Sequence, residues 1–176
     1  MKALFYRLRS IVSRLCVLAL GIQSERLSVI SLRSILVYNK GTVKVGKNTL
    51  IRSGLRIDCQ RGAEINIGNN VLIERNLHIS SVKRISIGDS VLLASNIYIS
   101  DHTHNISSEV TVRDAGVAKV EETVIKHGVW IGNNVVIMPG ITIAENAVIG
   151  ANSVVTCDIG MNEVWAGVPA KFLKLR

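Results

Sequence analysis

Residues 125–155 read IKHGVWIGNNVVIMPGITIAENAVIGANSVV, and an aliphatic side chain returns at every sixth position of this stretch. A period of six fits neither the turn of an α-helix nor the two-residue alternation of a simple strand. It fits a short strand followed by a sharp turn, in which the aliphatic side chain points inward and Gly or Asn takes the backbone angles of a corner. The stretch therefore predicts stacked short strands rather than a large sandwich.

The same step of six begins at Val45 and is followed at fifteen positions of the chain. Three steps close one coil of about eighteen residues, and neighbouring coils stack about 4.8 Å apart. The step is broken three times, and the longest interruption runs from Asp101 to Glu122. We predict an all-β solenoid of about five coils with loops at its corners. The fifteen positions are Val45, Ile51, Ile57, Ile67, Ile73, Ile79, Ile87, Leu93, Ile99, Ile125, Ile131, Ile137, Ile143, Ile149 and Val155.

Few of the hydrophobic residues are aromatic, since 48% of the 176 residues are hydrophobic and 4% are aromatic. The net charge of +8 is concentrated at one end: residues 1–44 hold eight basic and one acidic side chain, and the other 132 residues hold 13 basic and 12 acidic ones. The main body therefore lacks both a uniformly basic face and rings for stacking bases, and we predict no nucleic-acid partner.

Three cysteines, Cys16, Cys59 and Cys157, show neither a C-x-x-C motif nor the spacing of zinc ligands. An odd number of widely spaced cysteines is typical of reduced thiols in a cytosolic protein. We therefore predict a cytoplasmic protein.

In residues 1–40 the spacing of apolar residues differs from that in the rest of the chain. Arg7 and Arg14 lie away from a row of apolar residues at helical spacing, which predicts a basic amphipathic helix that is too short to span a membrane. Two interpretations stay open: the helix packs on the rest of the protein, or residues 1–37 lie on the anionic cytoplasmic face of a membrane. The apolar row is Leu4, Leu8, Ile11, Leu15, Leu18 and Ile22.

Four motifs in the second half resemble those of the hexapeptide-repeat acyltransferases, and are closest to the branch that O-acetylates sugars, including galactoside, maltose and surface-polysaccharide acetyltransferases. They are VWIGNNV at 129–135, MPGITI at 138–143, VIGANSVVT at 148–156 and AGVPAK at 166–171. The resemblance implies a left-handed parallel β-helix over 41–176, with the loop 101–122 and a C-terminal tail. It also implies a homotrimer, acetyl-CoA as acyl donor, no metal, and a sugar or glycan acceptor of surface polysaccharide biosynthesis.

The resemblance places the catalytic histidine just before the protruding loop, at His102. A histidine there can take the proton of the attacking hydroxyl and return it to the departing thiolate, because imidazole titrates near neutrality. Asp101 is a candidate to orient the ring. His104 is the alternative base, because a small shift of the loop would exchange the two. His78 and His127 are interpreted as surface residues.

The candidate binding residues follow from the same resemblance. Glu74 and Asn76 are candidates to bind the acceptor, and Trp130 to line the groove where donor and acceptor meet. The small residues at positions 132, 133, 150 and 151 would accommodate the pantetheine arm of the coenzyme, and Lys171 and Lys174 would bind its phosphates. Cys157 departs from the family, which has a basic residue there. The candidates for the coenzyme are Trp130, Gly132, Asn133, Gly150, Ala151, Lys171 and Lys174.

Three other functions remain open. The first is N-acyl transfer to an amino sugar or its nucleotide form. The second is a γ-class carbonic anhydrase, which holds zinc through three histidines, although the two-residue step between His102 and His104 is short for that family. The third is a non-catalytic β-helix that serves as a scaffold.

Overall fold

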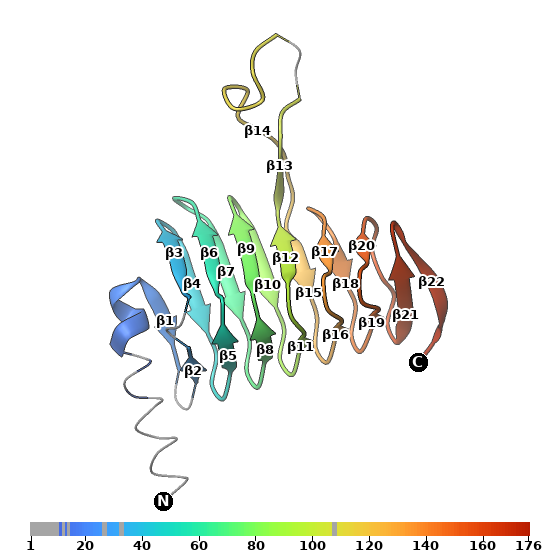
Figure 1. The fold of residues 1–176 in the computed structure, drawn as a ribbon, viewed down its shortest axis with the longest axis horizontal. Helices are drawn as coiled ribbons and strands as arrows, with labels where there is room; N and C mark the ends of the chain where they lie inside the picture. Colours follow the sequence, from blue (N-terminus) through green and yellow to red (C-terminus); the bar gives the residue numbers. More distant parts are fainter. Residues whose placement is uncertain (1–10, 12, 14, 26–27, 32–33, 107–108) are drawn as a thin grey trace, which may run out of the picture.

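The computed structural model describes residues 11, 13, 15–25, 28–31, 34–106 and 109–176. In it the chain passes through three sheets in turn (Figure 1). Sheet I contains β1 (Ile22–Ser24), β4 (Thr42–Val45), β7 (Glu64–Ile67), β10 (Arg84–Ile87), β15 (Thr123–Ile125) and β18 (Thr142–Ile143). Sheet II contains β2 (Val29–Ile30), β5 (Leu50–Ser53), β8 (Leu72–Arg75), β11 (Leu92–Leu93), β16 (Trp130–Ile131), β19 (Val148–Ile149), β21 (Glu163–Gly167) and β22 (Ala170–Leu175). Sheet III contains β3 (Leu36–Asn39), β6 (Arg56–Cys59), β9 (Leu77–Ser81), β12 (Ile97–Ser100), β17 (Val136–Ile137) and β20 (Val154–Val155).

Each coil gives one strand to each sheet, so the chain turns three corners per coil: I–II, II–III and III–I. Neighbouring coils pair in parallel, and only β21 and β22 pair antiparallel within these sheets. The prediction of a parallel β-solenoid is therefore confirmed, and it is consistent with a left-handed β-helix.

In the described residues the solenoid has six complete coils, where the sequence predicts about five. The additional coil is the first one, β1 to β3, and it comes from the segment 1–40 that the sequence predicts to be helical. In this coil Ser24 lies opposite Val45, and Ile30 is followed by Val37 after seven residues, so the period of six does not reveal it. Among the described residues of that segment, only residues 11, 13 and 15–19 are helical.

The core is a set of aliphatic columns that run along the solenoid. All fifteen positions of the six-residue step are buried, the most exposed being Ile67 at 3%. Ile87 lies opposite Ile125, and Ile125 lies opposite Ile143 in the next coil. Complete burial of such a side chain contributes about 1.5–3 kcal/mol, so these columns are the main support of the fold.

Asparagine side chains support the II–III corner. Asn76, Asn96, Asn134 and Asn152 have positive φ angles between 55° and 62°. Asn tolerates this left-handed conformation better than other non-glycine residues. Each side-chain amide donates to the next in the row at 2.8 to 2.9 Å, which links four successive coils.

The N-terminal helical residues close one end of the solenoid. Val17 is completely buried, and the Ser13 hydroxyl donates to the Ile30 carbonyl at 2.9 Å and accepts from the Ile30 N–H at 2.8 Å. No helix in the described part of the chain combines the length and apolar character needed to cross a membrane. Much of the segment 1–37 predicted to contact a membrane, including residues 1–10, lies outside the described residues.

An arm interrupts the III–I corner between the fourth and fifth coils and projects away from the solenoid (Figure 1). Its base is a two-stranded antiparallel sheet of β13 (His102–His104) and β14 (Val117–Val120). This arm corresponds to the predicted loop 101–122.

Candidate active site

Asp101 is a buried carboxylate at the base of the arm. Along β12 the side chains of Ile97 and Ile99 point into the core, and Asp101 continues this inward alternation with no exposed surface. Its Oδ2 accepts from the Ser81 hydroxyl at 2.6 Å and from the Lys83 N–H at 2.9 Å, and its Oδ1 accepts from the Val82 N–H at 2.9 Å. The carboxylate therefore fixes the III–I corner of the preceding coil.

These contacts hold Asp101 in its ionised form. Burial raises the pKa of Asp101, but its four hydrogen bonds, led by that from Ser81, together outweigh this effect. The pKa therefore lies below the ordinary value of an aspartic acid, because each donor favours the charged form.

The fourth of these hydrogen bonds orients His102. Its Nδ1 lies 3.0 Å from Asp101 Oδ1 and 3.3 Å from the Ser100 hydroxyl. An ionised carboxylate can only accept, so Nδ1 carries a proton, and in the neutral imidazole Nε2 then has a free lone pair. The His102 side chain is 12% exposed. A fixed imidazole of this tautomer can accept a proton at Nε2.

The neighbouring His104 is in a different environment. It is exposed on β13, with its ring centroid 6.3 Å from that of His102. Within the described part of the chain, its ring has no hydrogen-bond partner. The structure therefore distinguishes the two candidate bases, because only His102 has a carboxylate to hold it.

Backbone contacts at the neck of the arm fix the position of the pair. The Glu121 N–H donates to the Asp101 carbonyl at 2.9 Å. The Thr123 hydroxyl donates to the Ser100 carbonyl, also at 2.9 Å. The arm thus leaves and rejoins the solenoid at one point, and Asp101 and His102 sit on a rigid corner rather than on a loop.

The candidates for the acceptor lie elsewhere. Glu74 is on sheet II and forms an ion pair with Arg52 at 3.2 Å. Asn76 belongs to the asparagine row of the II–III corner, where its amide donates to Asn96. The structure does not bring either residue to the III–I corner that carries His102.

The exposed candidates for the coenzyme lie on sheet II and its II–III corner, whereas Gly132 is buried. Trp130 is 50% exposed, and it is connected through Val148 and Val164 to Lys174 across neighbouring strands. The side chains of Asn133, Ala151 and Lys171 are also exposed. This area and His102 lie on different sides of one chain.

Two of the predicted small residues have a packing role. A Cβ atom on Gly132 would lie 2.7 Å from the Ala151 nitrogen, and one on Gly150 would lie 2.7 Å from the Ala166 Cβ. Both distances are too short, so close stacking of coils already requires glycine here. The Asn133 amide oxygen accepts from the Ser95 N–H at 2.9 Å, which also ties it to the neighbouring coil.

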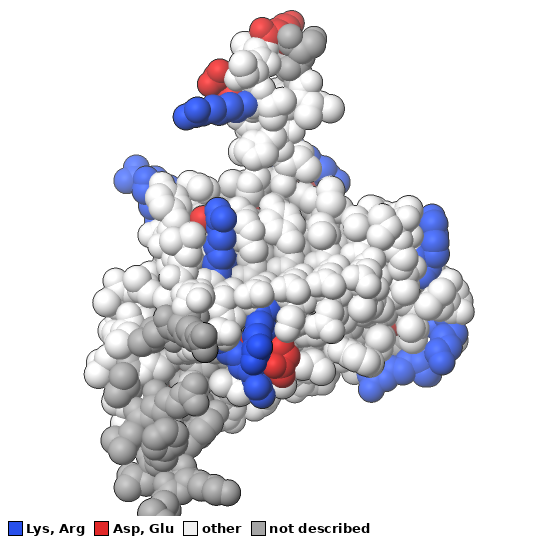
Figure 2. Space-filling model, in the orientation of Figure 1, with Lys and Arg blue, Asp and Glu red and all other residues white. Residues whose placement is uncertain are grey.

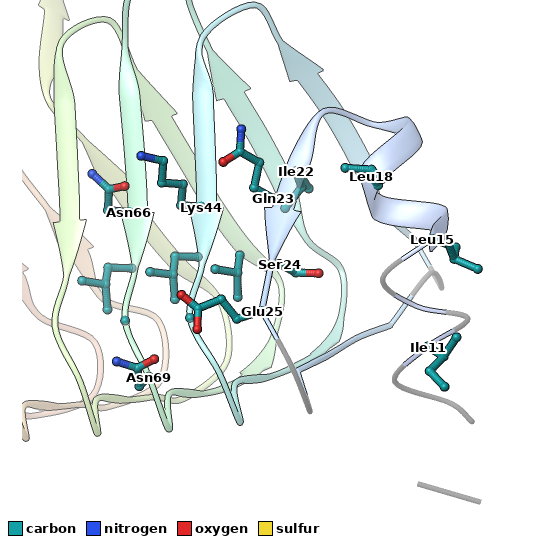
Figure 3. A pocket seen from close by; sticks show the side chains of 15 residues that line it. Ile11, Leu15, Leu18, Ile22, Gln23, Ser24, Glu25, Lys44, Asn66 and Asn69 are labelled. Carbon is teal, nitrogen blue, oxygen red and sulfur yellow. The ribbon is translucent and has the colours of Figure 1, made fainter. Parts of the chain in front are cut away.

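A groove of about 650 Å³ lies at the other end of the molecule, between the N-terminal helical segment and sheet I. Figure 3 shows Ile11, Leu15 and Leu18 along one side of it. It includes none of the predicted site residues, so its size does not make it the active site. Gln23, Lys44 and Asn66 project into it from neighbouring strands.

The distribution of charged side chains does not indicate a binding site either. On the face seen in Figure 2, Lys and Arg side chains lie in separate groups, some beside Asp or Glu. Among the residues that the structure describes, no three His, Cys, Asp or Glu side chains are grouped so that they could hold a metal ion.

Comparison with known proteins identifies the family. Residues 122–157 match the bacterial transferase hexapeptide (six repeats) model. The chain is 37% identical over 145 residues to a protein of Escherichia coli K12 named as the lipopolysaccharide biosynthesis O-acetyl transferase WbbJ, which covers 78% of this chain and 74% of that protein. The chain is a hexapeptide-repeat acyltransferase. Both the predicted family and the predicted enzyme class are confirmed.

Two solved structures place this acyltransferase among its relatives. A galactoside acetyltransferase in complex with coenzyme A superposes with a TM-score of 0.55 at 30% identity, over 89% of this chain and 64% of that one. AntD, an N-acyltransferase from Bacillus cereus, superposes with a TM-score of 0.77 over 93% and 90% of the two chains. At 21% identity, the likeness to AntD shows the fold alone.

Sequence reasoning missed the partners of Asp101 in this acyltransferase. Ser81 is 20 residues away along the chain, and the bonds from Val82 and Lys83 come from backbone groups. No sequence motif reports such contacts, because they exist only once two coils are stacked.

Proposed function

We propose that the protein transfers the acetyl group of acetyl-CoA to a sugar hydroxyl in surface polysaccharide biosynthesis, on the cytoplasmic side of the membrane. The observation that carries this proposal is the Asp101–His102 pair, a buried carboxylate 3.0 Å from an imidazole whose Nε2 is free to accept a proton. The similarity to WbbJ and to galactoside acetyltransferase supports a sugar hydroxyl as the acceptor.

In the proposed reaction, the acceptor hydroxyl oxygen attacks the thioester carbonyl while His102 Nε2 takes the hydroxyl proton. Asp101 stabilises the imidazolium that forms, since its negative charge faces Nδ1. The carbon–sulfur bond then breaks, and the imidazolium gives its proton to the departing thiolate. The products are an acetyl ester and free coenzyme A, and His102 returns to its starting state without a covalent acyl-enzyme.

The direct test is a transfer screen with acetyl-CoA and a panel of sugars and nucleotide sugars. Released thiol and the mass of the product should report transfer to at least one sugar, and the product should lose its acetyl group in mild alkali as an ester does. An alkali-stable amide would instead favour N-acyl transfer to an amino sugar, the activity named for AntD. Thiol release without any acetylated product would contradict the proposal.

The proposed active site requires more than one chain. His102 lies at the III–I corner and the predicted coenzyme area lies on sheet II, so a site that combines them is completed by the sheet II of a neighbouring copy. A closed three-fold ring joins these two unlike surfaces three times.

Sedimentation equilibrium should therefore give a homotrimer, three times the chain mass of 19.2 kDa. A monomer at micromolar concentration would separate His102 from the coenzyme area and contradict the shared site.

Lys171 and Lys174 are proposed to meet the phosphates of acetyl-CoA, with Trp130, Asn133 and Ala151 along the rest of the donor. Replacing both lysines by Ala should raise the KM for acetyl-CoA by about tenfold or more and leave kcat nearly unchanged, because the nucleotide end is bound equally in the ground and transition states. Steady-state kinetics at saturating acceptor measures this. Lys126→Ala, at the I–II corner, is the matched control. An unchanged KM in the double variant would locate the phosphates elsewhere.

A further inference from the structure

Three polar side chains from successive coils lie in a row on the outer face of sheet III, and the last of them is on the strand that leads to His102. They are Asp58 of β6, His78 of β9 and Tyr98 of β12. His78 lies opposite Tyr98 in the strand register, and Arg56 lies opposite His78. The sequence analysis treats His78 as an ordinary surface residue, because the step of six predicts only which residues point inward.

The contacts within this group are specific. His78 Nε2 lies 2.9 Å from Asp58 Oδ2, and Arg56 Nε lies 3.0 Å from the same oxygen. The rings of His78 and Tyr98 meet edge to face, with centroids 4.9 Å apart and an angle of 68° between their planes. These contacts fix the His78 ring between a carboxylate and a phenol ring.

The group keeps unused hydrogen-bonding capacity. Among the described residues, no donor contacts Asp58 Oδ1, and the Tyr98 hydroxyl has no hydrogen-bond partner. The side chains of Asp58 and His78 are 22% and 32% exposed, so they are accessible but too enclosed to move freely. The surface therefore offers an acceptor oxygen on Asp58 and a phenol hydroxyl on Tyr98, with the His78 ring in contact with both side chains.

This surface faces the same side of the solenoid as the proposed base. Ile97 and Ile99 point inward, so Tyr98 projects to the outside of β12, and His102 begins β13 directly after the buried Asp101. The four residue steps from the Tyr98 Cα atom to the His102 Cα atom span at most about 13 Å. A sugar bound over Tyr98 therefore lies within one or two sugar units of the imidazole.

We propose that Asp58, His78 and Tyr98 form a binding subsite for an uncharged sugar ring of the acceptor, next to the sugar that receives the acetyl group. Sugar hydroxyls match a carboxylate oxygen and a phenol, and the apolar face of a pyranose packs against an aromatic ring. Arg56 offsets the charge of Asp58, so the surface has no excess charge that would select an ionic sugar. This subsite rests on the proposed function, and it makes the acceptor an oligosaccharide rather than a single sugar.

The test compares single sugars with disaccharides, with acetyl-CoA as donor and p-nitrophenyl glycosides of galactose, glucose and their disaccharides as probes. The wild type should have a lower KM for disaccharides. Tyr98→Leu and Asp58→Asn should each raise the disaccharide KM about tenfold, the effect of one lost hydrogen bond or ring contact. The kcat and the KM for acetyl-CoA should stay unchanged.

Glu64→Gln, which breaks a surface ion pair with Arg84 on sheet I, is the matched control. Asp58→Asn preserves the volume of the side chain, so it tests the subsite even where Tyr98→Leu alters the strand, and thermal unfolding identifies a misfolded variant.

The outcomes separate the subsite from the function on which it rests. Wild-type transfer with an unchanged acceptor KM in both variants would overturn the subsite alone. A loss confined to kcat would also overturn it, since a binding subsite acts through KM. A p-nitrophenyl glucuronide is added as an anionic probe, and a lower KM for it that is lost in Arg56→Gln would replace the uncharged ring with a charged one. No transfer by the wild type to any sugar of the screen described above would overturn the proposed function and the subsite together.

Discussion

The His102→Ala variant should lose acetyl transfer by roughly 10²–10⁴-fold, the usual contribution of a positioned general base. The decrease should appear in kcat, because the imidazole acts on the proton that moves in the transition state. His102 lies at the neck of the arm and takes no part in the aliphatic core, so the variant should keep the oligomeric state and the coenzyme affinity of the wild type. Steady-state transfer assays and coenzyme titration measure these quantities.

His104→Ala is the internal control for this experiment. His104 is exposed and has no carboxylate to orient it, so its removal should change transfer much less. If the His104 variant is inactive and the His102 variant is nearly normal, the base is His104. If both variants remain active, neither histidine is the base.

Asp101→Asn should lower both activity and stability. An amide presents a donor NH2 at one of the two oxygen positions, so it faces either the Lys83 N–H, or the Val82 N–H and the His102 Nδ1–H, with a mismatched group. An unsatisfied buried donor costs about 1–3 kcal/mol, which corresponds to a decrease of the unfolding temperature by several degrees. We expect transfer to fall about 10²–10⁴-fold, because the wrong tautomer of His102 removes the lone pair from Nε2.

The stability effect of Asp101 should depend on pH in a defined direction. Its pKa is lowered in the folded protein, so its contribution is complete above the ordinary pKa of an aspartic acid, about 4. The contribution is lost as the pH falls through the lower pKa of the folded state. The difference in unfolding free energy between wild type and Asp101→Asn should therefore be constant near pH 7 and shrink in acid. A difference that grows in acid would contradict an ionised Asp101.

The sequence predicts the interior of the solenoid well and its first coil poorly. Every position of the six-residue step from Val45 to Val155 is buried, because an inward aliphatic residue is the one feature that each side of a coil must repeat. The first coil breaks that rule twice, with Ser24 in an inward position and a seven-residue step from Ile30 to Val37. On one side the first coil packs against the N-terminal helical segment rather than against another coil. Stacking on that side therefore does not require an inward aliphatic residue at every sixth position.

The candidate site is less predictable than the fold. His102 and Asp101 are neighbours in sequence, and their proximity could be foreseen. The network around Asp101 could not, because Ser81 reaches it only through the stacking of two coils. The contact between Asp58 and His78 likewise joins residues 20 apart, whereas the packing roles of Gly132 and Gly150 depend on distances that only coordinates supply.

Because the two ends of the arm meet at its neck, the arm can be replaced by another loop without disturbing the coils. The backbone bond between Glu121 and Asp101 keeps the two ends together, and Ile87 pairs with Ile125 as though no residues intervened. Doubling the length of a flexible loop costs only about 0.6 kcal/mol, which is small beside the burial of one core isoleucine. A relative can therefore acquire a longer or chemically different arm in a single genetic exchange without unfolding the solenoid or moving Asp101 and His102. Diversity among such enzymes can then accumulate in one loop while the six coils stay the same.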